Sequence, residues 1–397
     1  MKTTHELEKQ YIINTYNRQP GLTPCLVRGE GSYAWDDKGR KYLDFLSGLG
    51  VNAVGHCHPG VVEAIREQAG ALIHTSNLYY GAPQAELARE LVENTLPGGK
   101  AFFANSGAEA NEAAIKLARK YKPGRYKIIT ARASFHGRTL ATIAATGQEK
   151  YRKPFAPVVE GFAYGDFNDP ESFEKLVDDR TAAIMIEPVQ GEGGVYVAEH
   201  SFLEALRALC DREGILLIFD EVQCGMGRTG KLWAFQNYGI KPDLLTAAKG
   251  LGGGLPIGVM LAGERYAGVL QPGDHASTFG GNPVVCSAAM AVLNILLSGG
   301  FLDDVKGKGN FFKEKLEEII ADFPALASEY RGLGLICALE LSIDQAKRIQ
   351  GRCSSEGLLI NAIGDHVLRF LPPLTISSNE LEAGLKIIRR ILSEHSA

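Results

Sequence analysis

Asp220 and Lys249 are two side chains whose types and positions suit chemistry on an aromatic cofactor. Asp220 ends the apolar run 215–219, and Lys249 stands between the apolar run 244–248 and the glycine-rich stretch 250–254. Ligands of open α/β sheets bind at the carboxyl ends of the strands, so both side chains are expected to face one crevice. A carboxylate against a ring nitrogen and a lysine that binds the cofactor covalently are the two ends of a pyridoxal phosphate site.

Other interpretations of this stretch remain open at this point. The glycines of 225–230 match the dinucleotide-binding fingerprint, but the strand before them ends at Asp220 and no long amphipathic helix follows. Together with Lys231, the same glycines also match most of the phosphate-loop motif G-x-x-x-x-G-K-S/T. Leu232, however, stands at the position where a serine or threonine must hold Mg²⁺. A structural ion pair between Asp220 and Lys249 is the simplest alternative. The rest of the chain must decide among them.

A phosphate site is predicted where the strand 101–105 runs directly into a helix with an apolar face. Ser106 and Glu109 form a capping box, which by itself explains both residues. The functional interpretation is that Ser106, Gly107 and Ala108 present N–H groups and a hydroxyl to a phosphate, aided by the helix dipole. Such a phosphate would complete the cofactor site.

Further segments carry side chains suited to a planar cofactor and an acidic substrate. Phe135, His136 and Arg138 share one loop after a predicted strand. An aromatic face is a stacking platform for a planar cofactor, and a guanidinium beside it suits a substrate carboxylate. A core phenylalanine and a surface arginine are the ordinary alternatives. Arg369 lies on an apolar predicted strand, where a buried arginine needs an anion, and Glu192 lies in an acidic turn after another strand.

The elements that must position these residues alternate along the chain. Strands are predicted at 101–105, 126–130, 161–164, 182–187, 215–220, 243–248 and 258–262, with helices between most of them. This alternation is typical of a mainly parallel sheet that helices cover on both faces. Helices are also predicted at 61–72, 86–95, 283–297, 302–321, near 343–351 and from Asn379, and strands at 335–341 and 367–371.

These elements divide the chain into three segments. Residues 1–60 contain a predicted hairpin, 26–45, whose turn is at 37–39, and this segment belongs with a smaller domain. Residues 61–282 form a large cofactor-binding α/β domain. Residues 283–397 form a smaller α+β domain. The chain is long enough for more than one core, which agrees with this division.

Composition argues against several classes of protein. The net charge of -4 and the absence of a long run of one sign argue against nucleic acid and anionic membranes as partners. No apolar run approaches membrane-spanning length, and the N-terminal stretch has no apolar signal core. The seven cysteines are scattered without a C-x-x-C pair, as in a cytoplasmic protein. His56, Cys57 and His58 are too close together for one tetrahedral metal, so a turn is predicted there and no metal site.

Several motifs follow one another in a fixed order. They are SGAEAN at 106–111, FHGRT at 135–139, EPVQGE at 187–192, DEVQCGMGRTG at 220–230, Lys249 with Gly250, and RFLPP at 369–373. Together they resemble the class III pyridoxal-phosphate aminotransferases over nearly the whole chain. The resemblance implies fold type I of the pyridoxal-phosphate-dependent transferases, with a mainly parallel seven-stranded sheet, helices on both faces and a smaller α+β domain. Cys57 and Cys224 depart from the usual small or hydroxyl residues.

The resemblance also implies a role for each residue of the site. Lys249 holds pyridoxal phosphate covalently and then acts as the base and acid that moves the proton. Asp220 keeps the ring nitrogen protonated, so that the ring accepts electrons. The other cofactor-binding residues that it implies are Ser106, Gly107, Ala108, Phe135, His136, Glu221, Val222, Gln223 and Thr278.

A homodimer with shared active sites is implied as well, because the family takes Thr278, for the phosphate, and Ser277, for the substrate, from the neighbouring subunit. In the family Arg369 binds the α-carboxylate of glutamate or 2-oxoglutarate. Arg138 binds the carboxylate of N-acetylornithine, whose δ-amino group is transferred. Glu192 is the candidate to neutralise Arg369 when no carboxylate lies there.

Within the class, the closest similarity is to the members that act on N-acetylornithine in arginine biosynthesis. The segment Thr15-Tyr16-x-Arg18, the residues 29–31 of the predicted hairpin and the stretch 51–56 carry this similarity, and Tyr16 is a further candidate substrate residue. Succinylornithine, ornithine, 4-aminobutyrate and an acylated lysine-pathway intermediate remain alternative donors, because each has an ω-amine. A nicotinamide dehydrogenase built on the glycines of 225–230 and a catalytically idle homologue are the alternatives from other classes.

Overall fold

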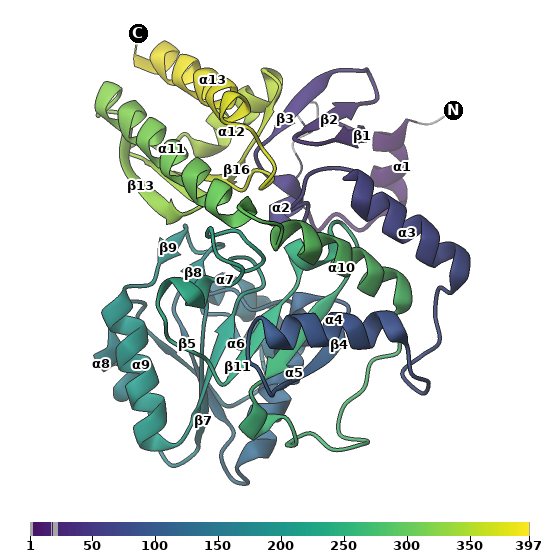
Figure 1. Ribbon diagram of the computed structural model, residues 1–397. Helices are drawn as coiled ribbons and strands as arrows, with labels where there is room; N and C mark the ends of the chain where they lie inside the picture. The colour runs from purple at the N-terminus through teal and green to yellow at the C-terminus, as the bar shows by residue number, and fades with distance from the viewer. Residues whose placement is uncertain (1–2, 17, 19–22, 397) are drawn as a thin grey trace.

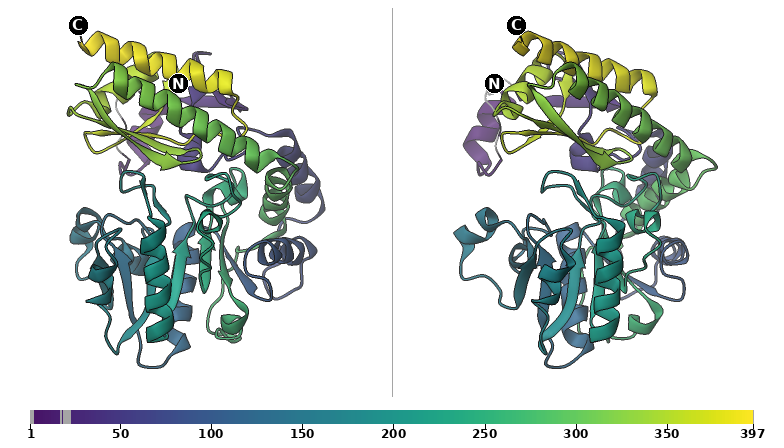
Figure 2. Two further views of the ribbon diagram at one scale, coloured as in Figure 1. Left: turned by 60° about the vertical axis from the view of Figure 1, so that its left-hand side comes forward. Right: turned by 90° about the vertical axis from the view of Figure 1, so that its left-hand side faces the viewer.

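The fold is described from a computed structural model, which describes residues 3–16, 18 and 23–396. Its elements form two parts (Figure 1). The larger part contains the central sheet and the helices around it. The other part combines the C-terminal elements with three N-terminal strands and lies over one end of the central sheet (Figure 2).

The central sheet confirms the strands expected from the alternating pattern. In spatial order its seven strands are β4 (Lys100–Ala104), β12 (Gly258–Ala262), β11 (Leu244–Ala247), β10 (Leu216–Asp220), β7 (Thr181–Ile186), β5 (Lys127–Ala131) and β6 (Phe162–Gly165). β10 pairs in parallel with β11 and with β7, whereas β12 is antiparallel to β11 and β4. The sheet is therefore mainly parallel, as predicted, and the carboxyl ends of its parallel strands lie along one edge.

Helices cover both faces of this sheet because apolar side chains occupy both sides of its strands. Leu217 of β10 belongs to the same buried cluster as α9 (His200–Glu213). The next residue, Ile218, points to the other face and packs in the cluster of α5 (Gly107–Tyr121). Successive strand residues point to opposite faces, so a continuous apolar run is what a strand covered on both sides requires.

The second part is built on an antiparallel sheet of four strands. In spatial order they are β13 (Ala327–Leu333), β14 (Ile336–Leu341), β17 (Val367–Phe370) and β16 (Asn361–Ile363). Its helices are α11 (Phe301–Asp322), α12 (Ala346–Ser355) and α13 (Ser378–Ser396). The predicted helices and strands of this region are present, and β13 and β16 were not predicted.

The N-terminal segment corrects one prediction. Instead of a single hairpin over 26–45, the chain forms the strands β1 (Leu26–Glu30), β2 (Tyr33–Asp36) and β3 (Lys41–Asp44). The first predicted strand is broken because Gly31 takes a positive φ of 55°, which turns the chain. β3 then pairs in parallel with β15 (Leu358–Leu359), which joins this segment to the C-terminal part.

The remaining elements connect these layers. They are α1 (Thr4–Tyr11), α2 (Ser47–Gly50), α3 (Pro59–Ala71), α4 (Ala82–Glu93), α6 (Leu140–Ala145), α7 (Glu149–Arg152), α8 (Pro170–Glu174), β8 (Val189–Gln190), β9 (Tyr196–Val197), α10 (Pro283–Leu296) and the short 3₁₀ helices η1 (Lys153–Phe155), η2 (Ala234–Asn237), η3 (Lys249–Gly252) and η4 (Glu264–Tyr266). Among the described helices none is by itself long and apolar enough to span a membrane; α10 and α11 pass that test only as a pair bent by 71°.

The turn predicted at 56–58 is confirmed. His58 caps α3, where its Nδ1 accepts the N–H of Gly60 at 3.2 Å, and His56 instead bonds Asp44 at 2.8 Å. The two imidazoles are therefore engaged in separate local contacts. In the described part of the chain, no group of three His, Cys, Asp or Glu side chains has the arrangement of a metal site.

Candidate active site

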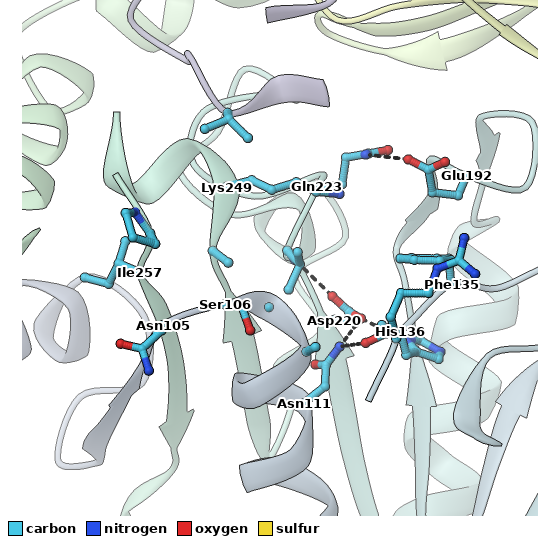
Figure 3. A pocket seen from close by; sticks show the side chains of 18 of the residues that line it. Asn105, Ser106, Asn111, Phe135, His136, Glu192, Asp220, Gln223, Lys249 and Ile257 are labelled. Atoms are coloured by element: carbon cyan, nitrogen blue, oxygen red, sulfur yellow. Dashed lines mark hydrogen bonds and ion pairs between the residues drawn. The ribbon is translucent and has the colours of Figure 1, made fainter. Parts of the chain in front are cut away.

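A pocket of about 430 Å³ lies at the carboxyl ends of the central strands (Figure 3). The loops after β4, β5, β7, β10 and β11 all contribute to its wall. Of the predicted site residues, those that line it are Ser106, Gly107, Ala108, Phe135, His136, Arg138, Glu192, Asp220, Val222, Gln223 and Lys249. Residues from distant parts of the sequence thus meet at the sheet edge where a ligand was expected.

Lys249 follows the end of β11 after one intervening residue and begins η3. Its backbone has a φ of +44°, an uncommon conformation for a residue other than glycine and one that often marks functional sites. The amine makes no hydrogen bond or ion pair with any residue that the structure describes. Desolvation lowers the pKa of Lys249 below its usual value, although the carboxylates of Glu192 and Asp220 oppose this. The neutral, nucleophilic amine is therefore present at lower pH than in an exposed lysine.

Asp220 lies at the end of β10, one strand from Lys249, and its carboxylate is firmly held. His136 Nδ1 and Asn111 Nδ2 each lie 2.7 Å from its Oδ2, and the N–H of Val222 donates to Oδ1 at 3.0 Å. Asn111 is in turn oriented by the hydroxyl of Thr246, which donates to its Oδ1 at 2.6 Å. This network fixes a buried carboxylate inside the pocket without neutralising it with a lysine or arginine.

Asn111 was not predicted as a site residue. It lies on the buried face of α5, one turn beyond the phosphate motif, and it lines the pocket. The single signal in the sequence was a polar residue among the apolar positions of that helix face, since a buried polar side chain needs partners.

Only one half of the predicted capping box between Ser106 and Glu109 is present, because the Glu109 carboxylate accepts the N–H of Asn105 and not that of Ser106. Ser106 caps α5, accepting the N–H of Glu109 at 3.2 Å, while Glu109 accepts the N–H of Asn105 at 2.6 Å. Gly107 and Ala108 form the first turn of the helix, where backbone N–H groups have no helical acceptor. A Cβ at Gly107 would lie 2.6 Å from Val222, so only glycine fits between the helix start and the wall of the pocket. Helix N-termini of this kind are where anionic groups commonly bind in proteins.

Phe135 and Arg138 lie together on the loop after β5. The N–H of Phe135 donates to Glu187 at 3.0 Å, which fixes the backbone beneath the ring. Arg138 is exposed, and its guanidinium lies 5.3 Å from the Phe135 ring and 4.0 Å from the Tyr151 ring. Desolvation, reinforced by the nearby charge of Asp220, raises the pKa of Glu187 well above its usual value. The loop thus presents an aromatic face and a cation to the same pocket.

Arg369 lies directly behind the pocket wall on β17 and is buried. Its Nη1 donates to Glu192 at 2.8 Å, to Gln223 at 3.3 Å and to the carbonyl of Gly191 at 2.7 Å, and its Nη2 donates to Asn361 at 2.7 Å. Burial alone would raise the pKa of Glu192, but the positive charges of Arg369 and Lys249 outweigh it and lower this pKa to about 2. Arg369 therefore has its anion within the chain, and that anion also faces the pocket.

Glu221, a predicted cofactor-binding residue, does not line the pocket. Its carboxylate accepts the N–H groups of Ala234 at 2.5 Å and Phe235 at 2.8 Å. Adjacent side chains at a strand end point to opposite sides, so Asp220 faces the pocket and Glu221 faces the loop that contains Ala234 and Phe235. Burial raises the pKa of Glu221 to about 8. Glu221 therefore contacts the loop at Ala234 and Phe235 in this structure.

Ser277, Thr278 and Tyr16 do not line the pocket of their own chain. Ser277 accepts a hydrogen bond from Asn105 at 3.2 Å, and Thr278 lines a separate hollow beside residues 74–84. Tyr16 is 65% exposed. Within one chain, therefore, these three predicted residues are not brought to the site.

The glycines of 225–230 do not form a dinucleotide site. Arg228 of this loop is buried and donates to the carbonyls of Leu335 and Pro372, which ties the loop to the C-terminal part. The helix after the loop is only the short 3₁₀ helix η2. A dinucleotide fingerprint needs a glycine turn that opens a full helix toward the ligand, and no full helix follows this loop.

Comparisons with known proteins agree with this geometry. Residues 15–392 match the family model described as aminotransferase class-III. The chain is 52% identical to the acetylornithine aminotransferase of Caldanaerobacter subterraneus subsp. tengcongensis, with 98% of each chain covered.

Two solved structures share the fold. The N-acetylornithine aminotransferase of Stenotrophomonas maltophilia has a TM-score of 0.83 and 38% identity, with 98% of each chain covered. The ornithine aminotransferase of Toxoplasma gondii, which has partial occupancy of PLP at its active site, has a TM-score of 0.92 and 31% identity, with 98% of this chain and 93% of that chain covered. The chain belongs to the class III aminotransferase family.

Proposed function

We propose that this protein is a pyridoxal-phosphate-dependent aminotransferase that transfers the δ-amino group of N-acetylornithine to 2-oxoglutarate, giving N-acetylglutamate 5-semialdehyde and glutamate. The observation that carries this proposal is the free amine of Lys249 in one pocket with the fixed carboxylate of Asp220 and the open helix N-terminus at Gly107. The names of the similar proteins support N-acetylornithine as the donor and arginine biosynthesis as the pathway.

The chain's own residues supply binding and proton transfer. Pyridoxal phosphate, when bound, supplies an aldehyde that condenses with amines and a ring that accepts the electron pair released beside the amine. Lys249 would hold the cofactor covalently, and its amine would move the proton. Asp220 would hold a proton on the ring nitrogen, and Phe135 and Val222, which also line the pocket, would contact the ring. Gln223 would bond the ring hydroxyl, and His136 orients Asp220 through the contact of its Nδ1 with the carboxylate.

A second copy of the chain completes the proposed phosphate-binding site. Gly107 and Ala108 offer N–H groups at the start of α5, but Thr278 does not reach the pocket of its own chain. Exposed apolar side chains lie near Thr278: Tyr79 lines the same hollow, Phe279 is the next residue, and Leu78 and Tyr80 flank Tyr79 in the sequence. Such a patch suits burial against another subunit. We infer a homodimer in which Thr278 and Ser277 enter the partner's site.

The cytoplasm is the proposed location. Each of the seven cysteines in the sequence is free, and five of them are buried. Free thiols are typical of proteins that work in a reducing compartment.

Mixing the purified protein with N-acetylornithine and 2-oxoglutarate tests the proposed reaction. Glutamate and the semialdehyde are expected in equal amounts. The same assay with ornithine, succinylornithine and 4-aminobutyrate ranks the donors by kcat/KM. A higher kcat/KM for one of these amines would show that this amine is the preferred donor. The absence of any amino transfer would overturn the proposed function.

Replacing Arg138 by glutamine tests the proposed binding of the donor. The KM for N-acetylornithine is expected to rise about 10- to 100-fold, because one charge-assisted contact to the substrate carboxylate is lost. The KM for glutamate in the reverse reaction should rise by less than that for N-acetylornithine, because glutamate keeps the contact of its α-carboxylate with Arg369 in the proposed site. Arg132→Gln is the matched control, because Arg132 is exposed, pairs with Asp166 and lies outside the pocket wall. Equal increases for both substrates would contradict the assignment.

Replacing Glu192 by alanine tests how one site accepts two substrates. Glutamate brings a carboxylate to Arg369, but N-acetylornithine presenting its δ-amine does not. The variant leaves Arg369 buried without its anion, so the kcat/KM for N-acetylornithine relative to glutamate is expected to fall about 100-fold.

Both half-reactions of the Glu192→Ala variant are followed by single-turnover kinetics. Because the pKa of Glu192 is held at about 2, the ratio in the unmodified enzyme should be the same at about pH 6 and about pH 9. Glu204→Ala, at an exposed carboxylate on α9, serves as the control. An unchanged ratio in Glu192→Ala would show that Glu192 does not separate the two substrates.

A further inference from the structure

Glu192 lies in the loop of a small β-hairpin. The strands β8 and β9 pair through Val189 with Val197 and Gln190 with Tyr196, so residues 191–195 form the loop between them. The loop contacts both parts of the protein, because Glu192 faces the pocket of the central sheet and also bonds Arg369 of the C-terminal sheet. The position of the Glu192 carboxylate therefore depends on how the two ends of this loop are fixed.

Two arginines of the C-terminal sheet hold the two ends of the loop. Arg369 donates to the carbonyl of Gly191, at the first end. Arg331, on β13, donates through Nε to the carbonyl of Gly194 at 2.9 Å, at the other end. The guanidinium of Arg331 also lies 4.4 Å from the ring of Tyr196, the first residue of β9. With both carbonyls held, a movement of Glu192 is confined to its own side chain.

Arg331 is itself held in place. It is 9% exposed, its Nη1 donates to Glu329 at 2.6 Å, and its Nη2 donates to Glu340. These contacts direct the remaining Nε–H at Gly194. A planar guanidinium has the donor geometry for three directed bonds at once, which a lysine ammonium on a flexible stem lacks.

The backbone beside this contact is strained. Val195 has a φ of +60°, which is strongly unfavourable for a β-branched residue. Its side chain is fully buried in a cluster with Ile336, Ala338 and Val367 of the C-terminal sheet. Such a conformation persists only where neighbouring contacts impose it, and it relaxes when one of them is removed. The Arg331 contact at Gly194 is adjacent to this strain.

We propose that Arg331 is a positioning residue that fixes the Gly194 end of the 191–195 loop and thereby holds the Glu192 carboxylate against Arg369. This inference rests on the proposed role of Glu192 in separating the two substrates. Loss of the Arg331 contact lets Val195 return toward an ordinary φ and moves Glu192 away from Arg369. The N-acetylornithine half-reaction is then impaired, whereas glutamate supplies its own carboxylate to Arg369.

The test compares single-turnover rates of Arg331→Gln with N-acetylornithine and with glutamate in the cofactor-loaded enzyme. The kcat/KM ratio of N-acetylornithine to glutamate is expected to fall about tenfold, because a small displacement of a positioned group has a large kinetic effect. In the Glu192→Ala background, Arg331→Gln is expected to change this ratio by less than about twofold, since a residue that acts through Glu192 has nothing left to position. This loss of effect in the double variant is a result that general destabilisation would not produce.

Control variants separate positioning from folding. Glu329→Gln removes one partner of Arg331 but leaves the bond to Gly194, and Arg207→Gln removes a partly buried arginine that pairs with Asp243 behind the central sheet. Both are expected to keep the ratio within about twofold of the unmodified enzyme. If Arg331→Gln does not fold, Tyr196→Leu removes the ring beside the guanidinium and is expected to lower the ratio about threefold.

The possible results have different meanings. An equal decrease of both half-reactions in Arg331→Gln, or a further change of the ratio in the Glu192→Ala background, would overturn the positioning role. A changed ratio in Glu192→Ala with an unchanged ratio in Arg331→Gln would overturn the role of Arg331 alone. An unchanged ratio in Glu192→Ala would overturn the proposed role of Glu192 and the inference that rests on it.

Discussion

Replacing Lys249 by alanine is expected to lower kcat by at least about 10⁴-fold, the largest effect of any single substitution in this chain. Lys249 is the only lysine that lines the pocket in the described part of the chain, and its amine is free of hydrogen bonds there. The substitution removes the covalent attachment of the cofactor and the group that moves the proton. No neighbouring side chain of the pocket can supply both functions, because Glu192 and Asp220 are engaged by other contacts.

Two measurements check the Lys249 prediction. The steady-state rate gives the loss of activity, and mass spectrometry after borohydride reduction shows whether the cofactor is attached to the chain. Lys241→Ala is the matched control, because Lys241 is exposed and lies at the opposite end of β11. A Lys249→Ala enzyme that keeps more than about a tenth of the activity would contradict the proposed mechanism. Cofactor found attached to another lysine would contradict it as well.

Replacing Asp220 by asparagine is expected to lower kcat about 10³-fold with the fold intact, the second largest effect. A neutral amide cannot hold a proton on the ring nitrogen, so the ring loses its ability to accept electrons. The effect is strengthened by the surroundings, because His136, Asn111 and the N–H of Val222 all present nitrogen atoms to this carboxylate. An amide nitrogen placed among these donors would find no acceptor.

The Asp220 prediction is checked by kcat and by the absorbance of the bound cofactor, which reports the protonation of its ring. Asp243→Asn is the control, because Asp243 also holds a partly buried arginine, Arg207, but lies outside the pocket. The Asp243→Asn substitution is expected to lower the melting temperature of the protein and to leave kcat nearly unchanged. An Asp220→Asn enzyme with normal kcat, or with normal ring protonation, would show that Asp220 is only a structural residue.

Strand ends made the core of the site predictable from the sequence. Asp220, Lys249 and Ser106 each follow a buried apolar run, and parallel strands bring their carboxyl ends to one edge of the sheet. The apolar runs were recognisable because strands covered on both faces need little polar surface. Each of the seven central strands was therefore found from local pattern alone, with small errors at the ends.

Contacts between distant segments were less accessible to sequence reasoning. The strand β13, ASEYRGL, carries Glu329 and Arg331 among its apolar residues, so its pattern does not resemble a buried strand. The hairpin of β8 and β9 has only two residues in each strand, too few for a periodic signal. The importance of Arg331 becomes visible only when β13 is placed beside this hairpin.

Glu221 and Thr278 show two other limits. Both acids of the pair 220–221 follow the same apolar run, and only the direction of the strand decides which of them faces the pocket. Thr278 lies outside the pocket of its own chain, so its proposed role depends on a second subunit. A single sequence contains no direct signal for a residue that acts in another copy of the same chain.

The visible absorbance spectrum of the cofactor-loaded protein, recorded with N-acetylornithine and no keto acid, tests the central claim most directly. The account predicts that the band of the lysine-bound cofactor disappears as the amino group is transferred, and that 2-oxoglutarate restores it. A band that responds to glutamate but not to N-acetylornithine would contradict the proposed donor. A protein that gains no such band with pyridoxal phosphate would contradict the proposed mechanism.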